Sequence, residues 1–551
     1  MADAQQHFFL FGIVTGLAIS ASVQYIVHCM VVKEKIKAGV AARLDPNKTE
    51  KPPSNAEDSE ADSPGQRGRP VSLPIRIATS VRRAISPDNT TNSVATSLYG
   101  LSPQSFLASD TIARSSSLLQ LDPIFSVPST KLHQIVVNMV SEMRKGLARD
   151  GEKLKMIPSY VVSLPTGNEV STVLALDLGG SNFRVCQVAF EGQGRVRNTQ
   201  RKYVVSESLK TGPVDQLFDF FAECVQKFLA EVNADASLEA HLGFTFSFPV
   251  HQTAINAGTL MHWNKGFRCA NAVGNDVVSL LRDAFKRKSV NVNVSALVND
   301  TVGALVAHAY HDPQTYIAVI LGTGTNAAYV ESLRDVAKWE GQKKGQMIIN
   351  TEWGAYDEPS VLPITKYDQQ LDRATSNPKA QIFEKMISGL YLGEIVRLIL
   401  VDLVSSGEIF KGRSSAELLK PYHFDTAYMS RVERDHSLEL SDTKNLFEDV
   451  LGVPSTSLYD RRIVKHICEL VGTRAARLTA AGVAAILTKI NRLNACTVAF
   501  DGSVFEHYPH FVNRMRDALR EILGITADNI VFEQSRDGSG QGAALIAALH
   551  A

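Results

Sequence analysis

Two stretches far apart in the sequence share one pattern, in which an apolar strand runs into a glycine turn and a second strand returns. Residues 174–190 are "LALDLGGSNFRVCQVAF", and residues 315–331 are "TYIAVILGTGTNAAYVE". Apolar runs bounded by glycine predict buried strands, and partial alternation after the turn predicts a second strand. Dinucleotide-binding and Walker loops place a helix after their glycines, so the pattern predicts β-hairpins instead. For either stretch alone, an ordinary tight hairpin is the alternative.

Asp177 stands at the end of the first predicted strand. A carboxylate in this position costs free energy unless something pairs with it. A metal-bound phosphate could do so, while the N–H groups of Gly179 and Gly180 face phosphate oxygens. Two Asp-Gly-Ser turns follow, at Asp501 after a short strand and at Asp537 before an Ala-rich helical pattern. Two hairpins and two such turns predict two related lobes that hold a polyphosphate between them.

Composition places the chain among globular proteins and excludes some functions. The 551 residues allow two or three domains, and 44% hydrophobic with 21% charged residues is typical of a globular fold. The formal net charge is zero and no basic stripe is interleaved with aromatics, so no nucleic-acid partner is predicted. The six cysteines are scattered without a Cys-x-x-Cys pair, which argues against a cysteine zinc site or a disulfide framework. A reducing compartment follows.

The amino terminus carries a predicted membrane anchor. Residues 8–32 contain no charged side chain, and a bilayer is crossed by about 20 apolar residues. A cleaved signal peptide is disfavoured, because the preceding "MADAQQH" lacks a basic region and the apolar run is long. The second alternative to a membrane anchor is a helix buried in a globular domain. Lys33, Lys35 and Lys37 follow, and basic residues stay in the cytosol. We therefore expect a cytosolic domain anchored at the mitochondrial outer membrane or, alternatively, the endoplasmic reticulum. Protein partners cannot be predicted.

Polar side chains cluster at predicted strand ends between and after the two hairpins. Asn299 and Asp300 lie at the junction of an apolar strand and a helical pattern, where ligands bind in open α/β sheets. Each acid singly could be a solvated strand end or a helix cap, and Glu384 at a predicted helix start favours the cap. Together they offer the donors and acceptors that a polyhydroxylated ligand needs. The set is Ser247, Asn264, Lys265, Asn299, Asp300, Asn326, Glu352 and Glu384.

The chain from about residue 121 to 550 resembles the hexokinase family. The matching segments, in family order and spacing, are "LPTGNE", "LALDLGGSNFRV", "LGFTFSFP", "NDTVGALV", "LGTGTNAAY", "INTEWGA", "FEKMISG", "DGSV" and "DGSGQGAALIAAL". The resemblance implies an α/β, actin-like ATPase (ribonuclease H-like) fold, with two lobes closing over a central cleft. It divides the residues that it covers into an amino-terminal helix with a small lobe (121–298) and a large lobe (299–551). Before them lie the predicted anchor with its basic flank (1–37) and a polar stretch (38–120), rich in Pro, Ser, Glu and Asp, whose composition predicts a flexible linker.

The resemblance also implies a reaction: phosphorylation of a hexose, glucose first, at its 6-hydroxyl by ATP with Mg²⁺. Asp300 would be the general base, and Lys265 would neutralise charge on the transferring phosphoryl group. The eight polar residues of the strand-end set would line the sugar. No separate metal site is implied, because magnesium would arrive with ATP near Asp177. The residues implied to hold the nucleotide are Asp177, Gly179, Gly180, Ser181, Asn182, Arg184, Gly322, Thr323, Gly324, Asp501, Gly502, Gly538 and Ser539.

Three positions depart from the usual family pattern. Ser181 and Asn264 each stand where Thr is usual, and Lys379 stands where Gly is usual. If the turn at Lys379 needs a positive φ, a non-glycine residue adds strain of about 1 kcal/mol or more. These departures leave two interpretations. One is an active membrane-anchored hexokinase, and the other is a catalytically weak or inactive hexokinase-like sugar sensor or regulatory protein.

The predicted anchor and linker generate a first test. Because a flexible tether separates the anchor from the folded domain, removing residues 1–37 should move the protein into the soluble fraction without loss of folding. Cell fractionation followed by circular dichroism of the truncated chain checks this. A truncated chain that still sediments with membranes would contradict the predicted topology.

Overall fold

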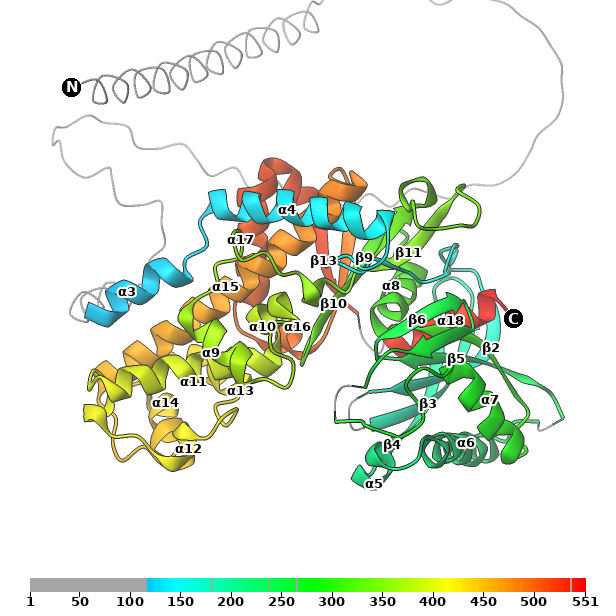
Figure 1. Ribbon diagram of the computed structural model, residues 1–551, viewed down its shortest axis with the longest axis horizontal. Helices are drawn as coiled ribbons and strands as arrows, with labels where there is room; N and C mark the ends of the chain where they lie inside the picture. Colours follow the sequence, from blue (N-terminus) through cyan, green and yellow to red (C-terminus); the bar gives the residue numbers. More distant parts are fainter. Residues whose placement is uncertain (1–115, 180–181, 236, 264–265, 536–537) are drawn as a thin grey trace, which may run out of the picture. The chain divides into compact units, whose positions relative to one another are not determined.

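The computed structural model describes residues 116–551, except 180–181, 236, 264–265 and 536–537. By contacts, the chain divides into two compact units, residues 1–93 and 94–551, and every element described below belongs to the second (Figure 1). The predicted anchor, its basic flank and most of the predicted linker lie outside the described residues.

The first large sheet contains the first predicted hairpin. Its strand order is β4-β3-β2-β5-β8; β2, β3 and β4 pair antiparallel, whereas β5 pairs parallel with β2 and β8. The hairpin is confirmed, with Asp177 directly opposite Arg184. The strands are β2 (Val170–Leu178), β3 (Asn182–Glu191), β4 (Val196–Val204), β5 (Ala240–Phe246) and β8 (Val292–Val298).

Both faces of this sheet are covered, which explains why β2 is an almost continuous apolar run. Leu174 and Leu176 pack with α6 (Val214–Glu231) and α7 (Val277–Arg287) on one face. Successive side chains point to opposite faces of a strand. Ala175 accordingly packs into a different core, shared with two helices that lie on the other face.

The second large sheet contains the second predicted hairpin, formed by antiparallel β9 and β10, which is also confirmed. Its order is β1-β11-β10-β9-β12-β13, with β12 parallel to both β9 and β13. The strands are β1 (Ile157–Pro158), β9 (Thr315–Leu321), β10 (Thr325–Ser332), β11 (Gln346–Asn350), β12 (Cys496–Asp501) and β13 (Ile530–Gln534). A separate small hairpin pairs β6 (Val250–Ala254) with β7 (Ala257–Leu260).

Two helices, α8 (Asp300–His311) and α18 (Gly538–Leu549), share a core with both sheets (Figure 1). This core is rich in alanine, so the layers approach closely. The closest contact between the two helices requires glycine, because a Cβ added to Gly542 of α18 would lie 1.9 Å from the carbonyl oxygen of Gly303 in α8. Only a residue without a side chain fits there. The two helices therefore cross with their backbones in contact.

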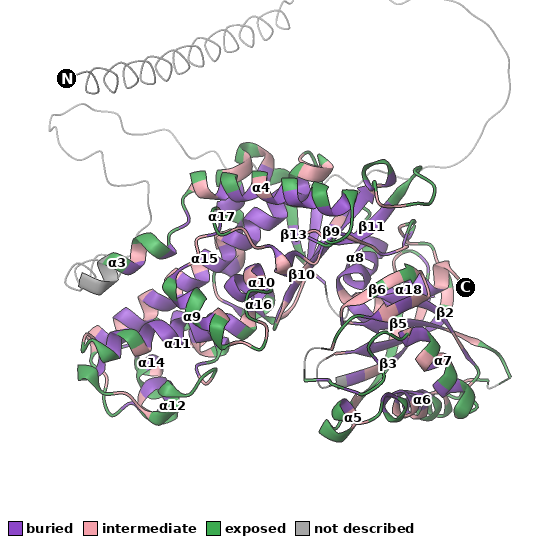
Figure 2. Ribbon diagram, in the orientation of Figure 1, coloured by how far each residue is buried: buried purple, intermediate pink, exposed green. Residues whose placement is uncertain are grey.

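A third region is helical and is built around α15 (Leu458–Ile490). Ser457 and Asp460 form a capping box at its start, and Asn491 ends it in the left-handed conformation. Among the described residues α15 is the one helix long and apolar enough to cross a membrane, but 83% of its most apolar window is buried inside the protein (Figure 2). It is therefore a core helix.

The remaining elements surround α15 or connect the sheets. They are α3 (Ser116–Phe125), α4 (Ser129–Ala148), α5 (Glu207–Thr211), α9 (Lys366–Ala374), α10 (Ile382–Ile387), α11 (Gly389–Ser405), α12 (Ala416–Leu419), α13 (Thr426–Arg434), α14 (Ser441–Asn445), α16 (Ser503–His507), α17 (Phe511–Leu523), a π-turn (Leu446–Val450) and four 3₁₀ turns (Leu333–Asp335, Trp353–Ala355, Phe410–Gly412 and Gly524–Asn529).

The two ends of the described chain each pack across the predicted lobe boundary at residue 298. Helix α4 contacts α15 and α17, and its Leu132, Ile135 and Met139 join the core of the second sheet. Helix α18, at the other end of the chain, packs on β2 and β5 of the first sheet. The two lobes therefore each contain segments from both halves of the sequence.

The glycine contact between α8 and α18 can be tested with two substitutions in one helix. Gly542→Ala forces a methyl group into the α8 backbone and should lower the free energy of unfolding by about 2–3 kcal/mol. Gly540→Ala is the matched control, because its nearest neighbour, Cys186 Sγ, lies 3.8 Å from the added Cβ. Urea unfolding followed by circular dichroism compares the variants. Equal effects of the two substitutions would contradict the proposed close contact.

Candidate active site

Asp177 is the centre of a polar contact between the first glycine turn and α18. The residue is 7% exposed and its side chain pairs with Arg184, whose Nε lies 3.1 Å from Oδ2. Ser539 Oγ donates to the same Oδ2 at 3.1 Å, and the Ser539 carbonyl accepts from Thr245 Oγ1 at 3.0 Å. The buried carboxylate is thus paired, and it ties the start of α18 to the ends of β2 and β5.

Asn299 and Asp300 lie at the junction between β8 and α8. Asn299 is the N-cap, and its Oδ1 accepts from the backbone N–H of Thr301 at 3.0 Å. The Oδ1 of Asp300 accepts from the same N–H at 2.9 Å. Caps of this kind are typical of Asn and Asp, whose side-chain oxygens satisfy free N–H groups of the first turn. The helix start therefore fixes both side chains at the carboxyl end of β8.

Asn326, Asn350 and Glu352 form one hydrogen-bonded group on β10 and after β11. Asn326 Nδ2 donates to Asn350 Oδ1 at 2.7 Å and to Glu352 Oε1 at 3.1 Å, and Asn350 Nδ2 donates to Glu352 Oε1 at 2.9 Å. Glu352 adopts a φ of 53°, a conformation that glutamate adopts rarely. This backbone turn directs its carboxylate back toward the two amides. Sequence analysis did not select Asn350; its position two residues before Glu352 at a strand end is the signal that could have identified it.

Glu384, in the first turn of α10, contacts the second glycine turn. Its Oε2 accepts from the backbone N–H of Thr325 at 3.0 Å, and a Cβ added to Gly324 would lie 2.7 Å from that oxygen. The same helix turn approaches the segment of Glu352, because a Cβ at Gly354 would lie 3.1 Å from Glu384 Cβ. Burial, and then the charge of Glu384, raises the pKa of Tyr391 to about 12. Glu384 therefore connects the second glycine turn to the hydrogen-bonded group around Glu352, in addition to any role as a helix cap.

The second glycine turn is held by backbone contacts. The N–H of Gly322 donates to the Gly324 carbonyl at 3.0 Å, and the Gly322 and Thr323 carbonyls accept from the first residues of α11 at 2.7 and 3.1 Å. Gly502 has a φ of 121° and lies so close that a Cβ would be 2.5 Å from the Leu321 carbonyl. The Asp501–Gly502 turn thus lies against the second glycine turn, whereas Ser539 lies at Asp177 of the first.

One small pocket, of about 30 Å³, is lined by two residues of the strand-end set, Asn299 and Glu352. Its lining includes Asn299 from the first sheet and Asn350 with Glu352 from the second, beside Phe246 and Phe248. The two phenylalanines also pack with Trp263, whose Nε1 donates to the Cys269 carbonyl at 3.1 Å. Ser247 lies between them and is half-buried. An aromatic wall therefore stands beside the polar groups.

Several predicted site residues cannot be placed. Gly180, Ser181, Asn264 and Lys265 lie outside the described residues. Asn182 begins β3, directly after that gap, and Gly179 precedes it. Gly538 begins α18, where a Cβ would lie 3.1 Å from the Ala304 Cα of α8. Among the residues that are placed, strand ends of both sheets converge on one region.

Comparison with known proteins shows to which family this chain belongs. Two family models, both described as hexokinase, match residues 118–310 and 316–549. The chain belongs to the hexokinase family. Hexokinase-1 of Spinacia oleracea is 44% identical over 450 residues, which cover 79% of this chain and 90% of the relative. The hexokinase of Kluyveromyces lactis is 43% identical over 442 residues, covering 78% and 91%.

Solved hexokinase structures share the fold. A hexokinase from Schistosoma mansoni complexed with glucose is similar with a TM-score of 0.73 and 38% identity, covering 80% of this chain and 99% of that one. A second hexokinase crystal structure gives a TM-score of 0.71 at 31% identity, covering 80% and 99%. The predicted actin-like ATPase fold is confirmed, and the protein is a transferase that phosphorylates hexoses.

Lys379 is the one departure from the family pattern that lies among the described residues. It adopts a φ of 62° in the turn between α9 and α10. Its backbone N–H donates to both carboxylate oxygens of Asp372 at 3.0 Å, and Asp372 also accepts from Lys385 Nζ at 2.7 Å. These contacts do not use the Lys379 side chain. The turn that leads into the Glu384 helix is therefore held in a conformation that suits glycine better than lysine.

The strain at Lys379 predicts a stabilising substitution. Lys379→Gly should raise the free energy of unfolding by about 1 kcal/mol, because glycine adopts a positive φ without the Cβ clash. Lys379→Ala is the matched control, since it removes the side chain but keeps Cβ, and it should give no gain. Urea unfolding of the three proteins measures the difference. A gain in both variants would assign the effect to the lysine side chain instead.

Proposed function

We propose that the enzyme transfers the γ-phosphoryl group of ATP to the 6-hydroxyl of glucose at the strand ends that meet between the two sheets. The observation that supports this most is the meeting of two strand ends in one pocket, Asn299 after β8 and Glu352 after β11. Amides and carboxylates on opposite walls suit a ligand with hydroxyl groups in several directions. The glucose complex of the similar Schistosoma mansoni hexokinase supports the choice of sugar.

Asp300 is the proposed general base. It is held at the start of α8 through Oδ1, next to Asn299 on the pocket wall. A primary alcohol is a weak nucleophile, and a carboxylate that accepts its proton as attack begins contributes about 100- to 10,000-fold in rate. The 6-hydroxyl would be oriented by hydrogen bonds from the sugar to Asn326, Glu352 and Glu384. Positioning of the hydroxyl in line with the phosphoryl group supplies much of the remaining acceleration.

The two glycine turns are proposed to face the phosphates of ATP. The backbone N–H groups of Thr323 and Gly324 can approach phosphate oxygens closely, because the glycines of the turn carry no side chain. Magnesium bound to ATP would neutralise part of the phosphate charge, and the Asp177 carboxylate is the type of oxygen ligand that magnesium prefers. Arg184 and Ser539 hold that carboxylate in place. Lys265 is assigned to the transferring phosphoryl group by its matching motif.

We also propose that residues 8–32 anchor the kinase in the mitochondrial outer membrane with the catalytic domain in the cytosol. The uncharged length of this segment and the lysines that follow it support the assignment. The phosphorylation reaction would then take place at a membrane surface, close to the source of ATP.

Asp300 provides the decisive test of this mechanism. Asp300→Asn keeps the size of the side chain and its oxygen acceptor, but the amide cannot take up the proton, so kcat should fall at least 100-fold. Glucose binding, measured by the fluorescence change of Trp263 and Trp353, should stay within about threefold of wild type. A coupled assay with glucose, fructose and mannose measures turnover.

The control is Asp283→Asn, which neutralises an exposed acid on α7 that pairs with Lys286 at 3.4 Å. It should leave both turnover and glucose binding unchanged. Turnover of Asp300→Asn near the wild-type value would show that Asp300 is not the base. If wild-type protein bound glucose but phosphorylated none of the three sugars, the sugar-sensor interpretation would be correct instead.

A further inference from the structure

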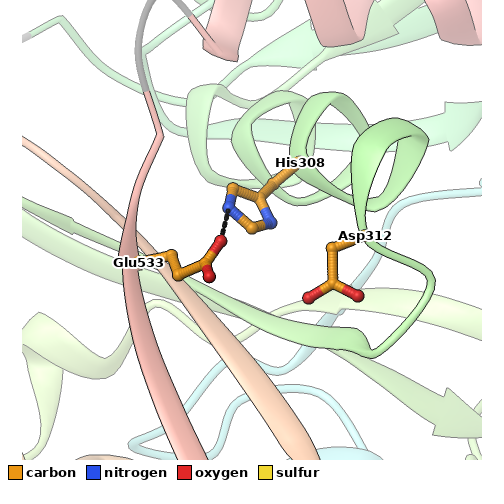
Figure 3. Close-up of side chains that lie close together, drawn as sticks. All are labelled: His308, Asp312 and Glu533. Atoms are coloured by element: carbon orange, nitrogen blue, oxygen red, sulfur yellow. Dashed lines mark ion pairs between the residues drawn. The ribbon is translucent and has the colours of Figure 1, made fainter. Parts of the chain in front are cut away.

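Three metal-ligating side chains converge at the end of α8 opposite to Asp300. His308 lies in the last turn of α8, Asp312 follows the helix, and Glu533 lies on β13. One ligand-type atom of each lies within 4.8 Å of the others, and His308 and Glu533 point toward each other with Asp312 beside them (Figure 3). Eight residues of helix separate His308 from Asp300 by about 12 Å. The group is therefore distinct from the sugar pocket.

The spacing of these atoms fits a small transition-metal ion. His308 Nε2 and Glu533 Oε2 are 3.3 Å apart. Two ligands at zinc distances of about 2.0–2.1 Å in tetrahedral geometry lie about 3.3–3.4 Å apart. The first two ligands thus already have the required separation. Asp312 is half-buried just beyond the helix end, and a carboxylate oxygen of it lies within 4.8 Å of a ligand atom of each of the other two, from where it can move closer to complete the same geometry.

The ring of His308 is oriented by a partner outside this group. Its Nδ1 lies 2.7 Å from the Oγ1 of Thr315, a fully buried residue at the start of β9. When Nδ1–H donates to this hydroxyl, the lone pair of Nε2 faces Glu533. Metal-binding histidines typically donate their second nitrogen in this way, which fixes the tautomer.

We propose that His308, Asp312 and Glu533 bind a divalent transition-metal ion, with Zn²⁺ as the best match. An imidazole with two carboxylates suits zinc, whereas magnesium and calcium prefer oxygen ligands alone. Three protein ligands leave a fourth position for water. Water can reach it, because the group lines a hollow of about 810 Å³ together with Glu191 and Arg195.

A bound ion would link α8 to β13. Helix α8 connects the first sheet to the second, and β13 of the second sheet leads into α18, which packs on the first. The chain runs from β8 through α8 to β9, and from β13 into α18. The ion would therefore stabilise the junction between the sheets without contacting the sugar. This role is independent of the catalytic assignments above.

The test uses full-length protein, freed of metal with a chelator and titrated with ZnCl₂ in the absence of ATP. Isothermal titration should detect one site of micromolar or tighter affinity. Asp312→Asn and Glu533→Gln should each weaken it at least tenfold, and the double variant should lose it. The midpoint of thermal unfolding should rise with Zn²⁺ in the wild type and not in the double variant. Hexose turnover of the double variant in zinc-free buffer verifies that it folds.

Glu417→Gln is the matched control, since Glu417 pairs with His423 at 2.8 Å and these two belong to no three-ligand group among the described residues. This variant should bind zinc as the wild type does. Zinc binding that persists in the double variant, as binding to cysteines would, overturns the proposal. Equal affinity for Mg²⁺ at this site would also overturn it, because the imidazole would then contribute nothing to the choice of ion.

Discussion

The backbone contact between α8 and α18 is the constraint on which the active site depends. Packed helices usually lie 8–10 Å apart, at a distance set by the side chains between them. Here Gly303 and Gly542 remove those side chains, and the surrounding core is rich in alanine. The two sheets that share this core can therefore approach each other. Strand ends from both sheets then reach one pocket, which longer side chains between the helices would prevent.

Short-range backbone geometry then determines where the polar groups point. Asn299 and Asp300 are placed by the capping of α8, and Glu352 is directed to its amide partners by a left-handed residue conformation. Glu384 accepts from a backbone N–H of the second glycine turn. The last of these contacts joins a residue assigned to the sugar, Glu384, to the glycine turn that is proposed to face the phosphates. The pocket and the glycine turns are therefore parts of one connected structure.

Sequence analysis predicted the local pattern better than the long-range arrangement. Both glycine hairpins and the strand–helix junction at Asp300 follow from apolar periodicity and turn residues, which are local signals. Asn350 was missed because its contribution depends on pairing between β10 and β11. For Lys379, the sequence predicted strain only if the turn needs a positive φ. Whether it does depends on backbone contacts with Asp372, which the sequence does not reveal. His308 and Glu533 are far apart in the chain, so no spacing rule could associate them before β13 was placed.

The exchange of chain ends between the sheets has a consequence for the order of folding. The first sheet takes one of its covering layers from α18, the last helix of the chain, while α4 from the beginning of the described region joins the core of the second sheet. A growing chain lacks residues 538–549 until long after the strands of the first sheet have been made. One face of the first sheet, with its apolar strand β2, therefore stays uncovered until the twelve-residue helix α18 has been made. A chain interrupted before α18 therefore leaves apolar surface open to chaperones.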